Sequence, residues 1–125
     1  MEEYNIDSVL DSIKKVLGDN PGFEYFNPDI IMQINTFFTV LTQIGVGPKE
    51  GVFITDNTTT WSDLFGTDAR LNSIKTYIFS RVKLLFNPSQ NSSYNEILKD
   101  TIKELEWRLN VQCDDWGNTE EVRHE

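Results

Sequence analysis

Four stretches of the chain carry apolar residues three or four positions apart, and this spacing constrains the fold more than any other feature of the sequence. In the first stretch, from Ile6 to Leu17, the spacing places the apolar side chains on one face of an α-helix of about three turns. Asn5 or Asp7 can cap the start of this helix, and Gly18 can close its end. The sequence therefore predicts an amphipathic helix here and a mainly α-helical fold for the chain.

A second helix is predicted from Asn27, which we expect to cap it, with Pro28 at the first helical position. Its apolar face runs from Ile30 to Ile44, and Gly45 ends it. The loop before this helix contains three aromatic residues, which a purely solvated loop does not need, so we expect them to pack onto the core. They are Phe23, Tyr25 and Phe26.

The segment VFITDNTTT, residues 52–60, differs from the helical stretches because it is rich in β-branched residues. We interpret it as a short β-hairpin with its turn at Asp56 and Asn57. Thr60 is followed three residues later by Asp63, which is typical of a capping box and predicts one helical turn over TWSDLFG.

A third helix is predicted from about Asp68 to Phe86, and its apolar arc is unusually wide. Phe79 and Phe86 lie on one flank of this arc. The helix is therefore either central in the fold or shared between the core and a partner. The centre of the arc is formed by Leu71, Ile74, Ile78, Val82 and Leu85.

The fourth predicted helix begins at a capping box formed by Ser93 and Glu96 and runs to about Gln112. Its core positions are Tyr94, Ile97, Leu98, Ile102, Leu105 and Leu109. Trp107 and Val111 project from the opposite, polar side. Either the first helix or the hairpin covers Trp107, or Trp107 anchors an interface with another protein.

Together these elements predict a small bundle of four helices, with a short β-hairpin or loop insertion between the second and third helices. The helical domain spans residues 1–112, and residues 113–125 form an acidic C-terminal tail without periodicity. Trp116 lies among the acidic residues of this tail and has little to pack against in its own chain. We therefore expect Trp116 to enter a pocket of a partner protein.

The sequence contains no pattern that predicts a catalytic, cofactor-binding or metal-binding site. The single histidine, His124, is next to last in the sequence, where nothing holds it against a nucleophile. Asp114 and Asp115 have no matching carboxylate or histidine cluster, so a solvated acidic segment is favoured over a metal site. The net charge of −9 argues against binding to nucleic-acid phosphates, and no apolar run approaches the roughly 20 residues that span a membrane. The sequence favours a protein-binding module, made in the cytosol, over an enzyme.

The loop IGVGP, the turn TWSD and the helix end KLLFNP occur in this order within residues 6–112 and resemble small phage and prophage proteins of Gram-positive hosts. The resemblance is to the head–tail connector, or adaptor, family of tailed phages. It implies a virion protein that forms a twelve-fold ring beneath the portal protein, leaves a channel for DNA and joins the capsid to the tail. The implied partners are the portal protein, neighbouring adaptor subunits and a tail-side neck or stopper protein. The family implies no catalytic residue and no cofactor.

On this basis, the segment 45–61, which is rich in Gly and Thr, is expected to project toward a neighbouring subunit or the next ring. The expected partner-binding residues are Asp56, Asn57, Phe79, Phe86, Trp107, Val111 and Trp116. The alternative is a small acidic regulatory or DNA-mimic phage protein, for which the net acidity is the only support. Such a mimic should display its acids in a spaced double row, whereas here they alternate with lysines along the helices.

Overall fold

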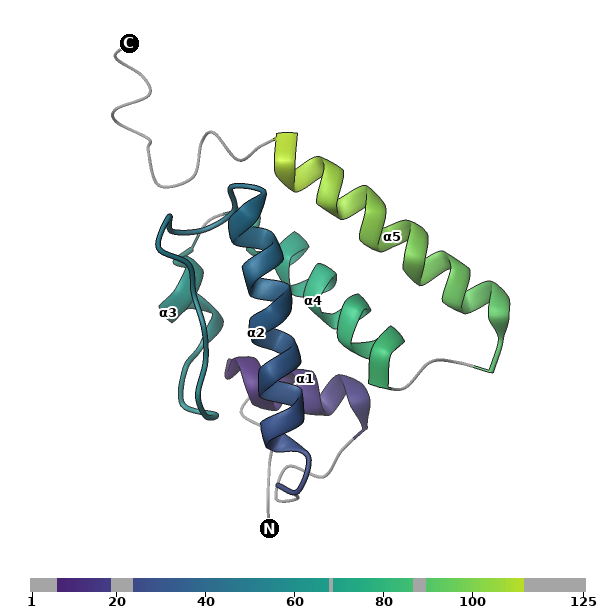
Figure 1. Cartoon of the computed structure of the whole chain (residues 1–125), viewed down its shortest axis with the longest axis horizontal. Helices are drawn as coiled ribbons and strands as arrows, with labels where there is room; N and C mark the ends of the chain where they lie inside the picture. The colour runs from purple at the N-terminus through teal and green to yellow at the C-terminus, as the bar shows by residue number, and fades with distance from the viewer. Residues whose placement is uncertain (1–6, 19–23, 68, 87–89, 112–125) are drawn as a thin grey trace.

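Five α-helices form the framework of the chain in the computed structural model, which describes residues 7–18, 24–67, 69–86 and 90–111 (Figure 1). They are α1 (Val9–Leu17), α2 (Asn27–Gln43), α3 (Trp61–Phe65), α4 (Leu71–Phe86) and α5 (Ser92–Val111). The mainly helical fold is thus confirmed, and the four longer helices occupy the predicted stretches. None of the described helices is both long and apolar enough to cross a bilayer.

The ends of α1 show which residues stop this helix. The Ser8 hydroxyl accepts a hydrogen bond from the Asp11 amide at 3.2 Å and caps the start. Gly18 closes the other end, as predicted, in a left-handed conformation with a φ of 82°. Asp7 is not the cap, because α1 begins at Val9 and Ser8 supplies the capping oxygen; the other predicted cap, Asn5, lies outside the described residues.

α4 is the central helix of the fold, since it packs against α1, α2 and α5. This position accounts for its wide apolar arc, because three helices cover it from different sides. The buried residues of α4 in the core include Ile74, Tyr77, Ile78 and Val82. The other helices contribute Val9, Leu10, Ile13, Ile30, Ile34, Phe38, Leu41, Ile102 and Leu109.

α5 lies along α4, and the axes of the two helices diverge toward the end where α4 stops and α5 starts (Figure 1). Three of the predicted core residues of α5 are buried: Leu98, Ile102 and Leu109. Tyr94 and Ile97 were predicted in the same core face but are exposed, and so is Leu85 in the last turn of α4. The divergence explains these corrections, because side chains at this end of the helix pair do not meet a facing helix.

The start of α5 also differs from the prediction. The Asn91 side-chain oxygen accepts hydrogen bonds from the amides of Ser93 at 2.9 Å and Tyr94 at 3.3 Å. Asn91 therefore supplies the cap, and the capping box expected from Ser93 and Glu96 is wrong.

The segment between α2 and α3 contains no strand in the part of the chain that the structure describes, so the predicted β-hairpin is wrong. The side chain of Asn35 in α2 accepts a hydrogen bond from the Ile54 amide at 2.8 Å and donates one to the Ile54 carbonyl at 3.0 Å. Near α3, an isolated antiparallel bridge joins Thr60 to Ser8. Because the two halves of the segment bind different parts of the chain, they do not pair with each other.

α3 begins with the predicted capping box. The Thr60 hydroxyl accepts a hydrogen bond from the Asp63 amide at 3.1 Å, and the Asp63 carboxylate accepts one from the Thr60 amide at 2.9 Å. Trp61 is buried, and its indole N–H donates a hydrogen bond to the Ser12 hydroxyl at 2.9 Å. This bond ties α3 to α1.

The aromatic loop before α2 does not pack as predicted. Tyr25 and Phe26 are exposed and lie edge to face against each other, with ring centroids 4.9 Å apart. Phe23 lies outside the described residues. Phe26 occupies the cap position of α2 and Asn27 is the first helical residue, so the chain enters the helix one residue earlier than expected.

Candidate interaction surface

The outer face of α5 presents two neighbouring apolar side chains to solvent. Trp107 is 67% exposed and Val111, one helical turn later, is 60% exposed. The buried residues Leu98, Ile102 and Leu109 face the opposite way, so neither α1 nor the segment after α2 covers the indole. The sequence left open whether another part of the chain covers Trp107. The structure places this residue on the surface.

A network of hydrogen bonds fixes α5 against α4. The Tyr77 hydroxyl donates to the Glu106 carboxylate at 2.7 Å, and Arg81 donates to the Tyr77 hydroxyl at 3.1 Å and to Glu106 at 3.2 Å. Burial and the hydrogen bond to Glu106 raise the pKa of Tyr77 to about 12. The Arg81 guanidinium also lies 4.9 Å from the centre of the Phe37 ring in α2, so the network joins three helices.

The C-terminal half of α5 is held at a second point, because the Asn110 side chain donates a hydrogen bond to the Ile44 carbonyl at 3.3 Å. Trp107 therefore lies between two attachments of its helix. A side chain on a fixed helix loses less freedom on binding than one on a loop, which favours a protein interface here.

Charged residues flank the exposed indole. Glu104 and Arg108 form an ion pair with a shortest N···O distance of 2.7 Å, and Lys99 pairs with Glu96 at 3.4 Å. Lys103, one turn before Trp107, is exposed and forms no ion pair with a described residue. The outer face of α5 thus combines apolar area with one unpaired cation.

Phe79 and Phe86 lie in different surroundings. Phe79 is partly buried and packs edge to face against Trp61, with ring centroids 6.0 Å apart. Phe86, the last residue of α4, is 40% exposed, next to the exposed Leu85. Of these two phenylalanines, only Phe86 therefore offers a large apolar surface to a partner.

The bend at Asp56 and Asn57 forms although the hairpin does not. The Asp56 carboxylate accepts hydrogen bonds from the Thr58 amide at 2.9 Å and the Thr58 hydroxyl at 2.6 Å. These bonds stabilise the charged carboxylate and so lower the pKa of Asp56 below its ordinary value. Asp56 and Asn57 are both exposed.

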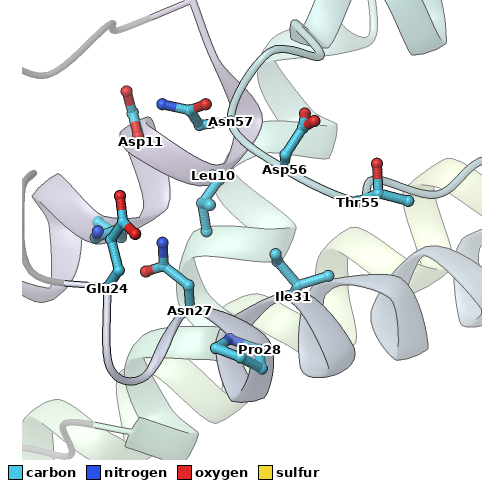
Figure 2. A pocket seen from close by; sticks show the side chains of 10 residues that line it. Leu10, Asp11, Glu24, Asn27, Pro28, Ile31, Thr55, Asp56 and Asn57 are labelled. Atoms are coloured by element: carbon cyan, nitrogen blue, oxygen red, sulfur yellow. The ribbon is translucent and has the colours of Figure 1, made fainter.

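A cavity of about 340 Å³ opens beside this bend, between α1 and the first turn of α2 (Figure 2). We call it the α1–α2 cavity, and its polar walls are formed by Asp11, Lys14, Glu24, Asn27, Asp56 and Asn57. Sequence reasoning missed the cavity, because its walls come from three separate segments. The helical spacing of α1 contained one sign of a polar site, because Lys14 follows Leu10 by one helical turn and so lies on the apolar face. In the structure Lys14 is only 1% exposed.

The structure does not bring the predicted partner-binding residues together. Trp107 and Val111 lie on α5, whereas Asp56 and Asn57 line the cavity beside α1 and the start of α2, to which α5 contributes no residue. Trp116 lies outside the described residues. Within those residues, no group of three or more His, Cys, Asp or Glu side chains is placed to hold a metal ion.

Comparison with known proteins identifies a family for most of the chain. The model of a family described as "Phage connector protein" matches residues 9–115, which is most of the chain. No curated protein and no solved structure was found to match.

Proposed function

The chain belongs to the family of phage connector proteins, and we propose that its copies form a ring beneath the portal protein and join the capsid to the tail. Membership itself makes the chain a structural component of the head–tail connection. For the ring we propose twelve copies, with a tail-side neck or stopper protein on the far side and DNA passing through the central channel. The net charge of −9 suits such a channel, because an acidic wall does not hold passing phosphates.

The single observation that carries this proposal is the exposed pair of Trp107 and Val111 on a helix that is fixed at two points. Tryptophan is enriched among the few residues that supply most of the binding energy of protein interfaces. A protein whose role is to join two larger assemblies needs such anchors on a rigid surface. We assign this pair to the contact with the portal or with a neighbouring subunit.

The C-terminal tail, residues 113–125, supplies a second proposed contact through Trp116. Deletion of the tail should leave the helical circular dichroism spectrum and the thermal unfolding nearly unchanged, while abolishing assembly onto the portal. The proposal for the tail is refuted if the shortened chain still assembles.

The bend at Asp56 and Asn57 is proposed to contact the neighbouring subunit or the next ring toward the tail. Its exposed position beside the cavity supports this role. Replacement of the two residues by a longer Gly-Ser insert should spare the fold and impair joining. Particles that acquire tails at normal yield with this insert would show that the bend is only a connection between α2 and α3.

The decisive experiment on the main proposal is negative-stain imaging of the full chain mixed with candidate portal proteins. We expect a ring of adaptor density under the portal, and we expect the double variant Trp107→Ala, Val111→Ala to lose it. Thr39→Ala, at an exposed position of α2, is the matched control and should keep the ring. Absence of any portal complex with the unaltered chain would overturn the proposed ring.

We expect the isolated chain to be monomeric or weakly associated, with the ring forming on the portal. Copies that each carry −9 repel one another, and association also costs about 4 to 15 kcal/mol of translational and rotational freedom. A portal that presents its sites in a circle raises the effective concentration of neighbouring copies. Light scattering at micromolar concentration tests this, since a stable ring without portal would show that templating is not required.

A further inference from the structure

The α1–α2 cavity carries an excess of negative charge. Three carboxylates line it, those of Asp11, Glu24 and Asp56, against the one ammonium group of Lys14. Neither Glu24 nor Asp56 forms an ion pair with another described residue. A cavity with two uncompensated carboxylates favours a cation.

A polar atom in the wall of the cavity also lacks a partner. The side-chain oxygen of Asn27 is fully buried and accepts no hydrogen bond from the described residues. Asn27 does not use this oxygen to cap α2, because it is already the first helical residue. A buried acceptor without a donor costs about 1 to 3 kcal/mol, so an N–H donor that reached this oxygen through a small shift of the Asn27 side chain would remove that cost. Figure 2 shows the Asn27 side chain directed between Glu24 and Leu10.

A lysine side chain has the chemistry that this site lacks, since its ammonium group carries one positive charge and three N–H donors on a long flexible stem. Lys103 is exposed on α5 and, unlike Lys99 and Arg108 on the same helix, has no carboxylate partner among the described residues. α5 packs against α4 and contributes no residue to the α1–α2 cavity, whose walls come from α1, the start of α2 and the bend at Asp56 and Asn57. Lys103 does not line the cavity of its own chain.

We infer that the Lys103 ammonium of one copy enters the α1–α2 cavity of a second copy. Lys103 and the cavity each have apolar residues beside them, which could pack against each other in this contact. Trp107 follows Lys103 by one helical turn, and the cavity is bordered by Pro28 of α2, with the exposed Met32 one turn later. The same contact thus matches a cation to carboxylates and an indole to an apolar helix face.

This contact joins two different surfaces of the chain, so each copy can bind one neighbour through α5 and another through its cavity. Contacts of this kind close into rings when the rotation between copies allows it. The inference rests on the proposed function and makes it more specific, because it names the surfaces through which neighbouring subunits meet.

A carbodiimide, which couples a lysine amine directly to a touching carboxylate, tests the contact on the unaltered full chain. At high protein concentration we expect dimers and longer oligomers, with mass spectrometry identifying links from Lys103 to Asp56 or Glu24. Because coupling is irreversible, it accumulates even when the association is weak. Lys103→Arg is the matched control: the guanidinium keeps the charge but is not coupled, so the oligomer bands should fall about tenfold while self-association persists.

Charge reversal gives a second measurement. Sedimentation equilibrium should show that Lys103→Glu and Asp56→Lys each weaken self-association about tenfold or more, and that the double variant recovers most of the loss. Lys49→Glu, on an exposed loop, lowers the net charge from −9 to −11 just as Lys103→Glu does, and should change self-association less than about twofold. Asp56→Lys is the more stringent variant, because it reduces the repulsion between copies and should still weaken their contact.

Links from Lys103 to other carboxylates, bands no stronger than those of Lys103→Arg, or an unchanged association constant in Asp56→Lys would each overturn the inference. The same coupling in intact particles separates it from the proposed function. A link from Lys103 to the portal protein would refute the contact between copies while leaving the connector ring in place. Absence of the chain from the particles would refute the ring itself.

Discussion

Replacement of Asn35 by alanine tests whether one side chain holds the segment between α2 and α3 in place. The substitution removes both hydrogen bonds to Ile54, of 2.8 and 3.0 Å, and leaves the amide and carbonyl of this residue without partners. Ile54 is buried, so water does not freely replace them. An unpaired buried polar group costs about 1 to 3 kcal/mol. Since Asn35 is only partly buried, we take the lower part of that range for each bond and expect a loss of about 2 to 3 kcal/mol of unfolding free energy.

Urea denaturation followed by far-UV circular dichroism measures this loss. Asn35→Asp keeps an acceptor for the Ile54 amide but removes the donor to its carbonyl, so it should fall between the alanine variant and the unaltered chain. Thr39→Ala is the control one turn later in α2, because it removes an exposed hydrogen bond to the Asn35 carbonyl and should cost less than about 0.5 kcal/mol. If Asn35→Ala unfolds at the same urea concentration as Thr39→Ala, the two bonds to Ile54 do not stabilise the fold.

Trp107→Ala should impair assembly on the portal while the unfolding free energy, measured with urea, stays within about 0.5 kcal/mol of that of the unaltered chain. A large loss of stability would show that the indole is part of the core. Trp61→Phe removes the buried hydrogen bond to Ser12 and should lower the unfolding free energy by about 1 kcal/mol in the same assay, a prediction that equal stability contradicts. Because the pKa of Tyr77 is raised from 10.0 to about 12 in the folded chain, the stability linked to its neutral form is complete below about pH 10 and is lost as the pH rises toward 12. Ultraviolet titration should show one tyrosine ionising near pH 12, and Glu106→Gln should lower its pKa; an unchanged titration would remove Glu106 as a cause.

Local signals in the sequence predicted the helices and several of their ends correctly. Gly18 closes α1 because the left-handed conformation favours glycine, and the box formed by Thr60 and Asp63 starts α3 because both partners lie within one turn. The exposed position of Val111 also follows from helical spacing alone. These features depend on residues close together in the chain.

The features that sequence reasoning missed depend on contacts between distant residues. The hairpin prediction failed because Asn35, nineteen positions earlier, binds the Ile54 backbone in place of a second strand. Ile97 fits the core spacing of α5 but is exposed, since the divergence of two helices is not encoded in the periodicity of either. The cavity lined by Asn27 likewise brings together three segments that are far apart in the sequence.

The division of α5 into a face that packs on α4 and a face that meets solvent affects how the chain tolerates mutation. Substitutions at the buried positions Leu98, Ile102 and Leu109 alter the core and are costly. Substitutions on the outer face, at Asp100, Lys103 or Trp107, change the surface offered to other proteins at little cost in stability. Recognition can therefore diversify between strains along one side of a helix while the other side keeps the same scaffold.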